Sequence, residues 1–238
     1  MLRLDKFLCD CGLGTRSQVK KDIRAGLVTV NGVKAARPEQ QVNEDTDIIC
    51  CRGTKCSYEK YVYYMLHKPA GVVSATEDAR ERTVLDLMKA EKRDGLFPVG
   101  RLDKDTEGLL LITDDGALAH ELLSPSRHVE KEYECYLMFP PDEEQKRRLE
   151  QGVDIGEKEL TRPAVVRILD EKRISLTITE GKFHQVKRML HAVGNEVVYL
   201  KRLRMGPLML DASLPKGSYR RLTKEETERL LHDRGCYF

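Results

Sequence analysis

Charged side chains gather between residues 100 and 108, directly before an apolar run. Residues 100–108 read Gly-Arg-Leu-Asp-Lys-Asp-Thr-Glu-Gly, and residues 109–113 read Leu-Leu-Leu-Ile-Thr. The apolar run is typical of a buried strand, which would hold the preceding polar side chains at a rigid edge. An ionised carboxylate beside a cationic side chain can act as a base or a nucleophile without a metal. We therefore expect a catalytic carboxylate here, and spacing alone leaves both Asp103 and Asp105 as candidates.

Two other interpretations of this segment were weighed. A solvated surface turn would explain the charges, because Asp-rich turns are common. An EF-hand calcium loop would also fit the spacing of Asp103, Asp105, Glu107, Gly108 and Asp114. The EF-hand requires a helix on each side, whereas residues 96–100 contain a proline and residues 109–112 predict a strand. Its closing ligand would also be Asp instead of the longer Glu, so we expect no metal here.

Further motifs of the chain occur in an order that a known family shares. Residues 66–71 read Leu-His-Lys-Pro-Ala-Gly, residues 131–133 read Lys-Glu-Tyr, and residues 181–189 read Gly-Lys-Phe-His-Gln-Val-Lys-Arg-Met. With residues 100–108 and the Asp-Asp-Gly at residues 114–116, these stretches resemble the motifs of pseudouridine synthases of the RsuA family. The resemblance implies an isomerase that converts uridine to pseudouridine inside folded RNA.

The resemblance also assigns roles to individual residues. Asp103 stands at the nucleophile position, because the family's Asp directly follows Arg-Leu, and this separates it from Asp105. Tyr133 matches the tyrosine that stacks on the target base. Arg101 and Lys187 would hold Asp103 ionised. Other branches of the superfamily carry Arg at the position of Lys187, and lysine offers a point charge without the bidentate fork.

The implied reaction breaks the N1–C1′ glycosidic bond, turns the uracil and rejoins it through C5. An ionised Asp can stabilise positive charge at C1′, by attack or by assisting an elimination, so no cofactor is expected. Residues 161–164 and 184–189, with the amino-terminal module described below, most resemble the branch that acts on small-subunit 16S rRNA. Enzymes for 23S rRNA or tRNA are the alternatives within the family. The expected partner is ribosomal RNA or an assembling ribosomal subunit, bound by a monomer.

Two hypotheses from other classes were compared with this one. A non-catalytic RNA-binding factor for ribosome assembly would be favoured by the loss of Asp103 or Tyr133, and both residues are present. A small-molecule hydrolase using Asp103 and His184 would leave the basic amino-terminal module unexplained. We expect His184 to have a structural or RNA-contacting role, because the chemistry that the resemblance implies does not need an imidazole.

Positive charge is concentrated in two segments of a chain whose net charge is only +2. Residues 1–37 hold eight basic and three acidic residues, and residues 182–204 hold six basic and one acidic residue. Two such concentrations suggest two contacts with a polyanion, although a solvated helix face would explain either one alone. The expected RNA contacts are Arg3, Lys6, Arg16, Lys20, Lys21, Arg24, Lys182, His184 and Arg188.

The first 58 residues predict a small α/β module. Apolar residues recur at helical spacing between residues 4 and 11, and Thr15 with Gln18 forms a capping box for a second helix that ends at residues 25–26. Asn31-Gly32 follows a short extended run and predicts a hairpin. The module resembles the S4 RNA-binding domain, which implies binding of structured RNA through shape and phosphates. Residues 53–59 read as a linker, so we expect domains at residues 1–58 and 59–238.

The second domain predicts α+β architecture with a mostly antiparallel mixed sheet, because its strands occur largely in adjacent pairs. Expected strands cover residues 61–66, 109–112, 133–138, 164–169 and 174–179, and expected helices cover residues 84–92, 116–123, 143–150 and 184–193. A capping box at Thr223 and Glu226 starts a last helix.

Cysteine usage and hydropathy set the expected location. Seven cysteines at irregular spacings fit a reducing compartment better than a disulfide framework. A zinc site is disfavoured because neither Cys9 with Cys11 nor Cys50 with Cys51 has the usual ligand spacing. No apolar run has membrane-spanning length, and residues 1–6 lack a signal-peptide core, so a cytoplasmic protein is expected.

Overall fold

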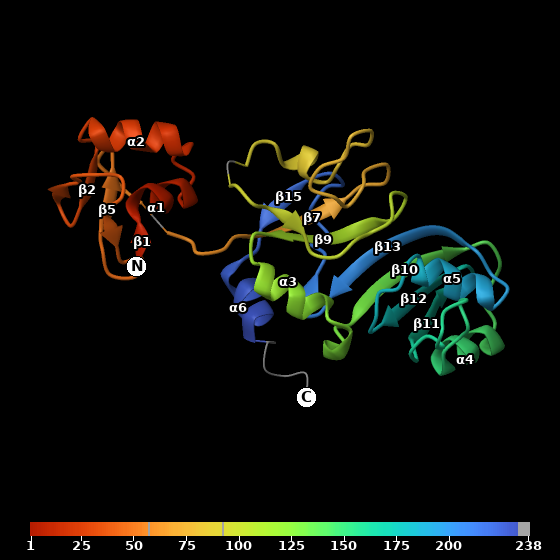
Figure 1. The fold of residues 1–238 in the computed structure, drawn as a ribbon. Coiled ribbons are helices and arrows are strands. Elements are labelled where there is room, and N and C mark those ends of the chain that lie inside the picture. Colours follow the sequence, from red (N-terminus) through yellow and green to blue (C-terminus); the bar gives the residue numbers. More distant parts are fainter. Residues whose placement is uncertain (57, 92, 233–238) are drawn as a thin grey trace. The chain divides into compact units, whose positions relative to one another are not determined.

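The computed structural model describes residues 1–56, 58–91 and 93–232. The chain divides into an amino-terminal unit, Met1–Val62 with Lys89–Gly95, and a carboxy-terminal unit, Tyr63–Met88 with Leu96–Phe238 (Figure 1). The return of residues 89–95 to the first unit was not indicated by the sequence. Three residues that entered the sequence predictions, Ser57, Lys92 and Cys236, lie outside the described residues.

The amino-terminal unit combines two helices, α1 (Leu4–Asp10) and α2 (Arg16–Arg24), with two small sheets. The sheets pair β1 with β4 and order the other strands as β3-β2-β5-β6. The strand bounds are β1 (Leu2–Arg3), β2 (Val28–Val30), β3 (Val33–Lys34), β4 (Gln41–Val42), β5 (Ile49–Cys51) and β6 (Thr54–Lys55). Apolar side chains of both helices and of the strands share one buried cluster. The burial of this cluster leaves the polar face of α2 toward solvent.

Local signals in this unit are confirmed. Asn31 and Gly32 adopt φ angles of 51° and 81° between β2 and β3, as a tight hairpin turn requires. The Thr15 hydroxyl accepts a hydrogen bond of 3.4 Å from the backbone N–H of Gln18 at the start of α2. Gly12, with φ 73°, takes the left-handed conformation just after α1.

Nine strands of the carboxy-terminal unit, as far as the structure describes it, form one mixed sheet. Its main path is β11-β12-β10-β13-β9-β7-β15, while β14 pairs with β13 and β8 pairs with β9. The strand bounds are β7 (Tyr63–Lys68), β8 (Phe97–Pro98), β9 (Glu107–Thr113), β10 (Lys131–Leu137), β11 (Val165–Asp170), β12 (Arg173–Ile178), β13 (Val197–Met205), β14 (Leu208–Met209) and β15 (Tyr219–Arg221). The pair β13·β9 is parallel and the other named pairs are antiparallel, which confirms the predicted mostly antiparallel sheet.

Four helices that the sequence predicted are present in this unit. They are α3 (Gly116–Leu123), α4 (Glu143–Gln151), α5 (Gln185–Ala192) and α6 (Lys224–His232). The Asp115 carboxylate accepts a hydrogen bond of 3.0 Å from the N–H of Leu118 at the start of α3. At the start of α6, Thr223 and Glu226 exchange hydrogen bonds of 2.8 and 3.2 Å, which is the expected capping box.

The helix expected at residues 84–92 is wrong. Only a four-residue 3-10 helix, Leu85–Met88, forms there. The segment Lys89–Gly95 belongs to the amino-terminal unit, where Arg93 donates a hydrogen bond of 2.8 Å to the Lys60 carbonyl and another to the Asp10 carbonyl. These tertiary hydrogen bonds take the backbone away from the helical path that its side-chain pattern favoured.

Gly108 lies where the parallel strands β9 and β13 meet. Gly108 and Arg202 are partners in the register of these strands. The φ angle of Gly108 is 109°, and a Cβ atom there would lie 2.2 Å from the Arg202 carbonyl oxygen. Only glycine allows the two backbones to approach this closely, so Gly108 fixes how residues 100–106 enter the sheet.

Candidate active site

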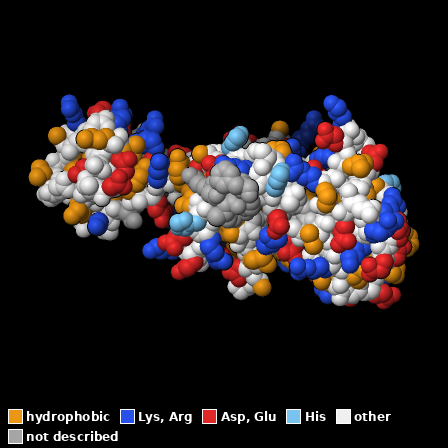
Figure 2. All heavy atoms as spheres, turned by 90° about the horizontal axis from the view of Figure 1, so that it is seen from below, with side chains coloured by type: hydrophobic (Ala, Val, Ile, Leu, Met, Phe, Trp, Pro, Cys, Tyr) orange, Lys and Arg blue, Asp and Glu red, His pale blue; other side chains and the backbone are white. Residues whose placement is uncertain are grey.

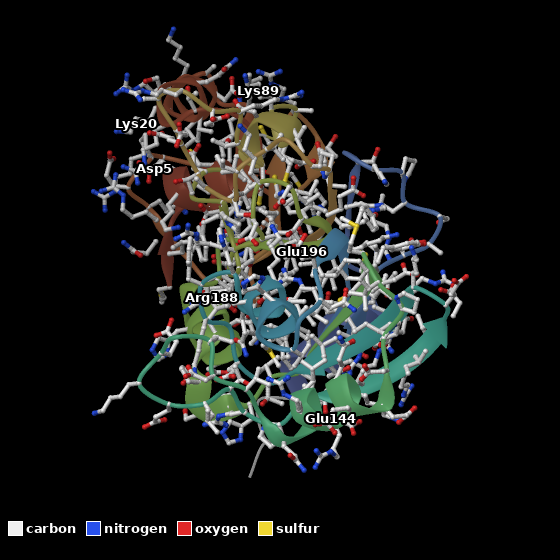
Figure 3. All side chains as sticks on the ribbon, turned by 90° about the vertical axis from the view of Figure 1, so that its right-hand side faces the viewer. Asp5, Lys20, Lys89, Glu144, Arg188 and Glu196 are labelled. Carbon is white, nitrogen blue, oxygen red and sulfur yellow. The ribbon has the colours of Figure 1, made fainter. Side chains whose placement is uncertain are left out.

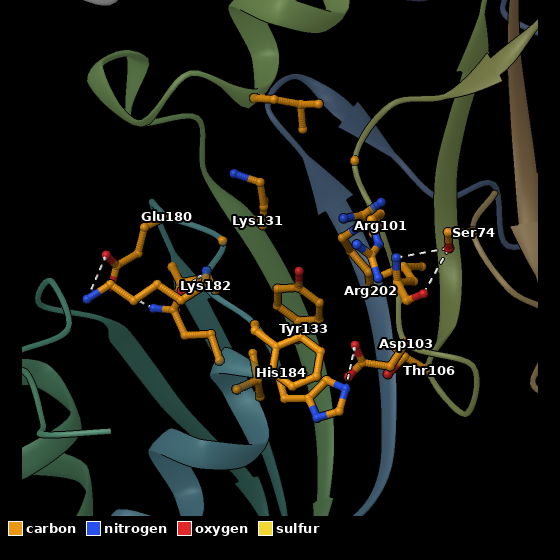
Figure 4. A pocket seen from close by; sticks show the side chains of 18 of the residues that line it. Ser74, Arg101, Asp103, Thr106, Lys131, Tyr133, Glu180, Lys182, His184 and Arg202 are labelled. Carbon is orange, nitrogen blue, oxygen red and sulfur yellow. Dashed lines mark hydrogen bonds and ion pairs between the residues drawn. The ribbon is translucent and has the colours of Figure 1, made fainter. Parts of the chain in front are cut away.

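A pocket of about 870 Å³ lies on the carboxy-terminal unit. Part of its wall comes from residues 98–106, which lead into β9, and part from residues 178–187, which lead into α5. Tyr133 of β10 and Arg202 of β13 also line it (Figure 4). A volume in the usual range for ligand sites, about 300–1,000 Å³, is large enough for a nucleotide drawn out of an RNA chain.

Asp103 lies in this pocket with two basic side chains next to its carboxylate. Lys187 Nζ is 3.3 Å from Asp103 Oδ2. On the other side, His184 Nε2 is 3.4 Å from Asp103 Oδ1, and Figure 4 shows this contact. His184 adopts the left-handed backbone conformation, with φ 48°, and its ring stacks on Phe183 with centroids 3.7 Å apart. Because Lys187 lies in the first turn of α5, the turn at His184 and the start of the helix together place both basic groups beside Asp103.

Asp105 differs from Asp103 in both exposure and position. Its side chain is 73% exposed, and Lys187 Nζ donates to Asp105 Oδ1 at 2.6 Å. This hydrogen bond lowers the pKa of Asp105 below its ordinary value. Asp103, with 26% of its side chain exposed, lines the pocket. The lysine is therefore shared, but only the Asp103 carboxylate is presented to a ligand in the pocket.

Arg101 was expected to hold the Asp103 carboxylate ionised, but in the described part of the chain it does not lie in an ion pair with that carboxylate. It is exposed and lines the pocket, but the described residues contain no ion pair between Arg101 and Asp103. The buried Leu102 separates them, and Ser74 holds its backbone through hydrogen bonds of 2.8 and 3.0 Å. Successive side chains along this extended segment point different ways, which leaves Lys187 and His184 as the basic groups beside Asp103.

Tyr133 lies on β10, between β12 and β13, with its ring in the pocket wall. It is 7% exposed. Its register partner on β13 is Arg202. An aromatic ring fixed in a sheet and open to a pocket on one side can stack on a planar ligand.

Lys68 is a residue that sequence reasoning left without a role. Its side chain is fully buried at the end of β7. Its ammonium donates hydrogen bonds to the backbone carbonyls of Asp103 at 2.9 Å, Lys104 at 3.3 Å, Thr106 at 2.8 Å and Pro69 at 3.2 Å. Burial lowers the pKa of Lys68 to about 8. A lysine at the end of an apolar strand was the available signal, since buried lysines are rare unless their charge is compensated.

Lys131 and Arg202 also line the pocket and also lacked an assigned role. Lys131 is 9% exposed and donates a hydrogen bond of 3.0 Å to the Val129 carbonyl. Burial, and secondly the charge of Arg202, lower the pKa of Lys131 to about 8. Neither residue could be placed in the pocket from the sequence, because their positions depend on how β10 and β13 pair.

The basic residues expected to bind RNA in the amino-terminal unit fall into two groups. Arg3, Lys6 and Lys20 each have a carboxylate partner, with distances of 2.8 Å from Arg3 to Asp5, 2.6 Å from Lys6 to Asp10 and 4.0 Å from Lys20 to Asp5. Lys20 and Asp5 are labelled in Figure 3. Arg16, Lys21 and Arg24 are exposed on α2 and have no ion pair within the described part of the chain. The second group is therefore the one whose charge is uncompensated.

The basic residues near α5 are more strongly engaged within the protein. Arg188 pairs with Glu157 at 2.8 Å and also donates to the carbonyls of Ile155 and Phe183. Lys182 lies 3.7 Å from Glu180 and donates to two backbone carbonyls near residue 160. Across the face drawn in Figure 2, Lys and Arg side chains are interspersed with Asp and Glu. Positive charge is therefore locally balanced over much of this surface.

The described residues contain no group of three or more His, Cys, Asp or Glu side chains placed to hold a metal ion. The charged segment at residues 100–108 is flanked by strands β8 and β9, not by the helices of an EF-hand. The six cysteines within the described ranges are free thiols. Of the helices that the structure describes, none is long and apolar enough to cross a membrane.

Two family models match the chain. The model for RNA pseudouridylate synthase matches residues 62–192, and the model for the S4 domain matches residues 2–48. The first match contains Asp103, Tyr133 and Lys187, so these three residues lie within one family domain.

Relatives of known name cover almost the whole chain. An uncharacterized RNA pseudouridine synthase of Bacillus subtilis is 49% identical over 96% of this chain and 98% of its own length. Ribosomal small subunit pseudouridine synthase A of Vibrio cholerae is 42% identical over 94% and 97%, and the Escherichia coli K12 protein of that name is 39% identical over 94% and 98%. A crystal structure of a pseudouridylate synthase, 40% identical, superposes with a TM-score of 0.68 over 97% of this chain and 100% of that chain.

Proposed function

The chain belongs to the RNA pseudouridylate synthase family, and from that membership we propose that it isomerises a uridine of small-subunit ribosomal RNA, with Asp103 as its catalytic carboxylate. The observation that carries the proposal is the Asp103 carboxylate in the pocket wall, 3.3 Å from Lys187 Nζ. An ammonium at that distance stabilises the negative charge of the carboxylate, which the chemistry requires. Tyr133, in the same pocket, supplies a ring on which the uracil can stack.

The proposed reaction consumes no second substrate. The N1–C1′ bond breaks and its electron pair leaves with the uracil, while Asp103 either bonds to C1′ or removes a proton to assist an elimination. The uracil then turns, and its C5 forms the new bond to C1′ as the Asp103–C1′ bond breaks or, in the elimination, as the removed proton returns from Asp103 to the sugar. The hydrogen on C5 leaves as a proton, and N1 gains a proton, so the product is an isomer of the substrate. Each of these steps uses only protein carboxylate chemistry and proton transfer.

A uridine must leave its stack before it can reach Asp103. Extruding a base costs a few kcal/mol, which phosphate contacts elsewhere on the RNA can offset. Arg16, Lys21 and Arg24 on α2 are the exposed cations of the amino-terminal unit that we assign to this contact. Structured RNA is then held by its backbone while the carboxy-terminal unit takes the base.

Small-subunit rRNA is the proposed substrate because relatives at about 40% identity over nearly the whole chain carry that name. Enzymes that act on 23S rRNA or tRNA are not favoured by these relatives. A non-catalytic assembly factor is not favoured either, because Asp103, Tyr133 and Lys187 remain together in or beside an open pocket. We place the reaction in the cytoplasm, on free rRNA or an assembling subunit, with the protein acting as a monomer.

Pseudouridine mapping tests the proposal. Small-subunit rRNA would be mapped from cells that lack the gene and from the same cells supplied with wild-type protein or with Asp103→Asn. We expect one pseudouridine to vanish in the deletion strain, to return with wild type and to stay absent with Asp103→Asn. A small-subunit map that the deletion leaves unchanged would overturn the substrate assignment, and restoration by Asp103→Asn would overturn the role of Asp103.

A further inference from the structure

A guanidinium lies buried in the pocket without full compensation. Arg202 on β13 is 1% exposed. Its Nε donates a hydrogen bond of 2.8 Å to the Leu109 carbonyl. Its Nη2 is buried and has no hydrogen-bond partner within the described part of the chain. Buried polar groups in native proteins are nearly always hydrogen-bonded, and an uncompensated buried cation is costly.

The Arg202 side chain belongs to the wall of the pocket. Arg202 and Tyr133 are register partners on neighbouring antiparallel strands, so their side chains emerge next to each other on one face of the sheet. Both line the pocket, and Figure 4 shows the Arg202 side chain between the Tyr133 ring and Arg101, above Asp103. A second buried pocket atom, Thr106 Oγ1, also lacks a partner among the described residues. Two polar atoms without partners in one pocket indicate that a polar ligand supplies the hydrogen bonds that the described residues do not.

Electrostatics restrict that ligand to an electron-rich hydrogen-bond acceptor. Lys131, beside Tyr133 on the same strand, adds a second cation to the pocket wall. Glu180 also lines the pocket, but it is engaged by Lys182 at 3.7 Å and by Gln185 at 2.6 Å. The inner wall is therefore cationic where it adjoins the Tyr133 ring.

A phosphate and a uracil carbonyl are both hydrogen-bond acceptors. The burial of Arg202 decides which of the two can reach it. An RNA phosphate continues into the chain on both sides, so a phosphate at the 1%-exposed Arg202 would draw two backbone segments into the pocket. A nucleobase is a terminal group and enters a pocket alone. Phosphates can instead meet the exposed Arg101 on the same pocket wall.

We propose that Arg202 is a catalytic residue that donates a hydrogen bond through Nη2 to a carbonyl oxygen of the extruded uracil, with Lys131 adding positive charge to the same wall. This inference rests on the proposed function. When the N1–C1′ bond breaks, the electron pair that leaves with the uracil is shared with its carbonyl oxygens. A fixed, buried donor at such an oxygen stabilises that charge more in the transition state than in the bound substrate. Arg202 therefore acts on the departing base while Asp103 acts on the sugar.

The test uses the full-length protein and a small-subunit rRNA transcript that carries tritium at uridine C5, since formation of the new bond releases that hydrogen. Single-turnover rate constants and RNA dissociation constants would be measured for wild type, Arg202→Met and Arg202→Lys. Arg173→Met is the matched control, because Arg173 is an arginine of the same sheet that pairs with Glu134 at 2.9 Å and does not line the pocket. We expect Arg202→Met to lower the rate constant on the order of 100- to 1,000-fold with RNA affinity unchanged, and Arg173→Met to leave both unchanged.

A substrate change separates catalysis from a structural role. Replacing the target uridine by 2-thiouridine or 4-thiouridine puts a weaker acceptor at one carbonyl position. In wild type, one of these changes should alter the rate constant, and in Arg202→Met the same change should have a much smaller effect. Such non-additivity indicates that Arg202 and that atom interact, whereas equal effects of both thio changes in both proteins would overturn the inference.

The remaining outcomes are also decisive. Absence of tritium release by wild type on any rRNA transcript would overturn the proposed function itself. Release by wild type together with an unchanged rate constant for Arg202→Met would overturn only the role of Arg202. If Arg202→Met does not fold by circular dichroism, Arg202→Lys and Lys131→Met take its place. If both of those variants have the rate constant of wild type, the proposed action of Arg202 and Lys131 on the uracil is overturned.

Discussion

The ammonium of Lys68 donates a hydrogen bond of 2.9 Å to the backbone carbonyl of Asp103, and further hydrogen bonds of 3.3 and 2.8 Å go to the carbonyls of Lys104 and Thr106. One buried cation thus holds three carbonyls of the loop that presents the proposed catalytic carboxylate. Lys68→Met should therefore shift the Asp103 carboxylate and lower the single-turnover rate constant on the order of 100-fold, since small displacements in an active site have effects of that size. RNA affinity should change little. An unaltered rate constant in a folded Lys68→Met protein would show that the loop keeps its shape without this lysine.

The rate should fall as the pH rises through about 8. Burial lowers the pKa of both Lys68 and Lys131 to about 8, so both are protonated below that pH and lose their charge above it. Loss of a proton from Lys68 removes one donor from the loop, and loss from Lys131 weakens the cationic pocket wall. The alkaline limb of a single-turnover pH profile should then reflect two groups in wild type and one in Lys68→Met or Lys131→Met. A profile that is flat to pH 10 in wild type would contradict this assignment.

Asp103→Asn and Asp105→Asn should behave differently, although both remove one carboxylate charge next to Lys187. Asp103→Asn should abolish tritium release while RNA affinity stays within a few-fold, because the change removes the charge but little volume. Asp105→Asn should retain most activity, because the Asp105 side chain is 73% exposed and lies outside the pocket wall. The reverse result would move the catalytic role to Asp105.

Gly108→Ala should destabilise the carboxy-terminal unit by more than about 3 kcal/mol. The new Cβ atom would lie 2.2 Å from the Arg202 carbonyl oxygen, and the φ angle of 109° is unfavourable for alanine. Gly116→Ala is the matched control, since a Cβ atom at this helix position meets nothing within 4 Å and alanine favours the helix. Urea unfolding of both variants should show a loss of stability for Gly108→Ala and no loss for Gly116→Ala.

Replacing Arg16, Lys21 and Arg24 together by Ala should weaken RNA binding in a salt-dependent way. Three lost phosphate contacts, at about 0.7 to 0.9 units each, would lower the slope of log affinity against log salt by roughly two to three. Replacing Arg3 and Lys6, which already pair with Asp5 and Asp10, should have a smaller effect. Salt titrations of RNA binding would measure both slopes. An unchanged slope in the triple variant would show that α2 is a solvated helix face.

The sequence by itself determined those features that depend on neighbouring residues. The order of motifs led to the family, and the resemblance of the Asp directly after Arg-Leu to the family motif led us to propose Asp103, not Asp105, as the catalytic carboxylate. The caps at Thr15, Asp115 and Thr223 began helices as expected, because a cap is satisfied within a few residues. The Asn31-Gly32 hairpin followed for the same local reason.

Tertiary structure alone decided which distant groups meet. Lys187 reaches Asp103 and Asp105 across more than eighty positions of the chain, whereas Arg101, two residues from Asp103, makes no ion pair with it among the described residues. Residues 84–91 kept only a short 3-10 helix, because the segment Lys89–Gly95 belongs to the other unit, where Arg93 donates a hydrogen bond to the Lys60 carbonyl.

The proposed roles of Lys68 and Arg202 also depend on tertiary structure and could not be predicted from the sequence. Each reads in the sequence as one more basic residue in a chain that has 41 lysines and arginines. Their burial depends on strand register, which places Lys68 opposite Gly108 and places Arg202 beside both Gly108 and Tyr133. The cost of burying a charge, and hence the evidence for what each one binds, arises only after the strands have paired.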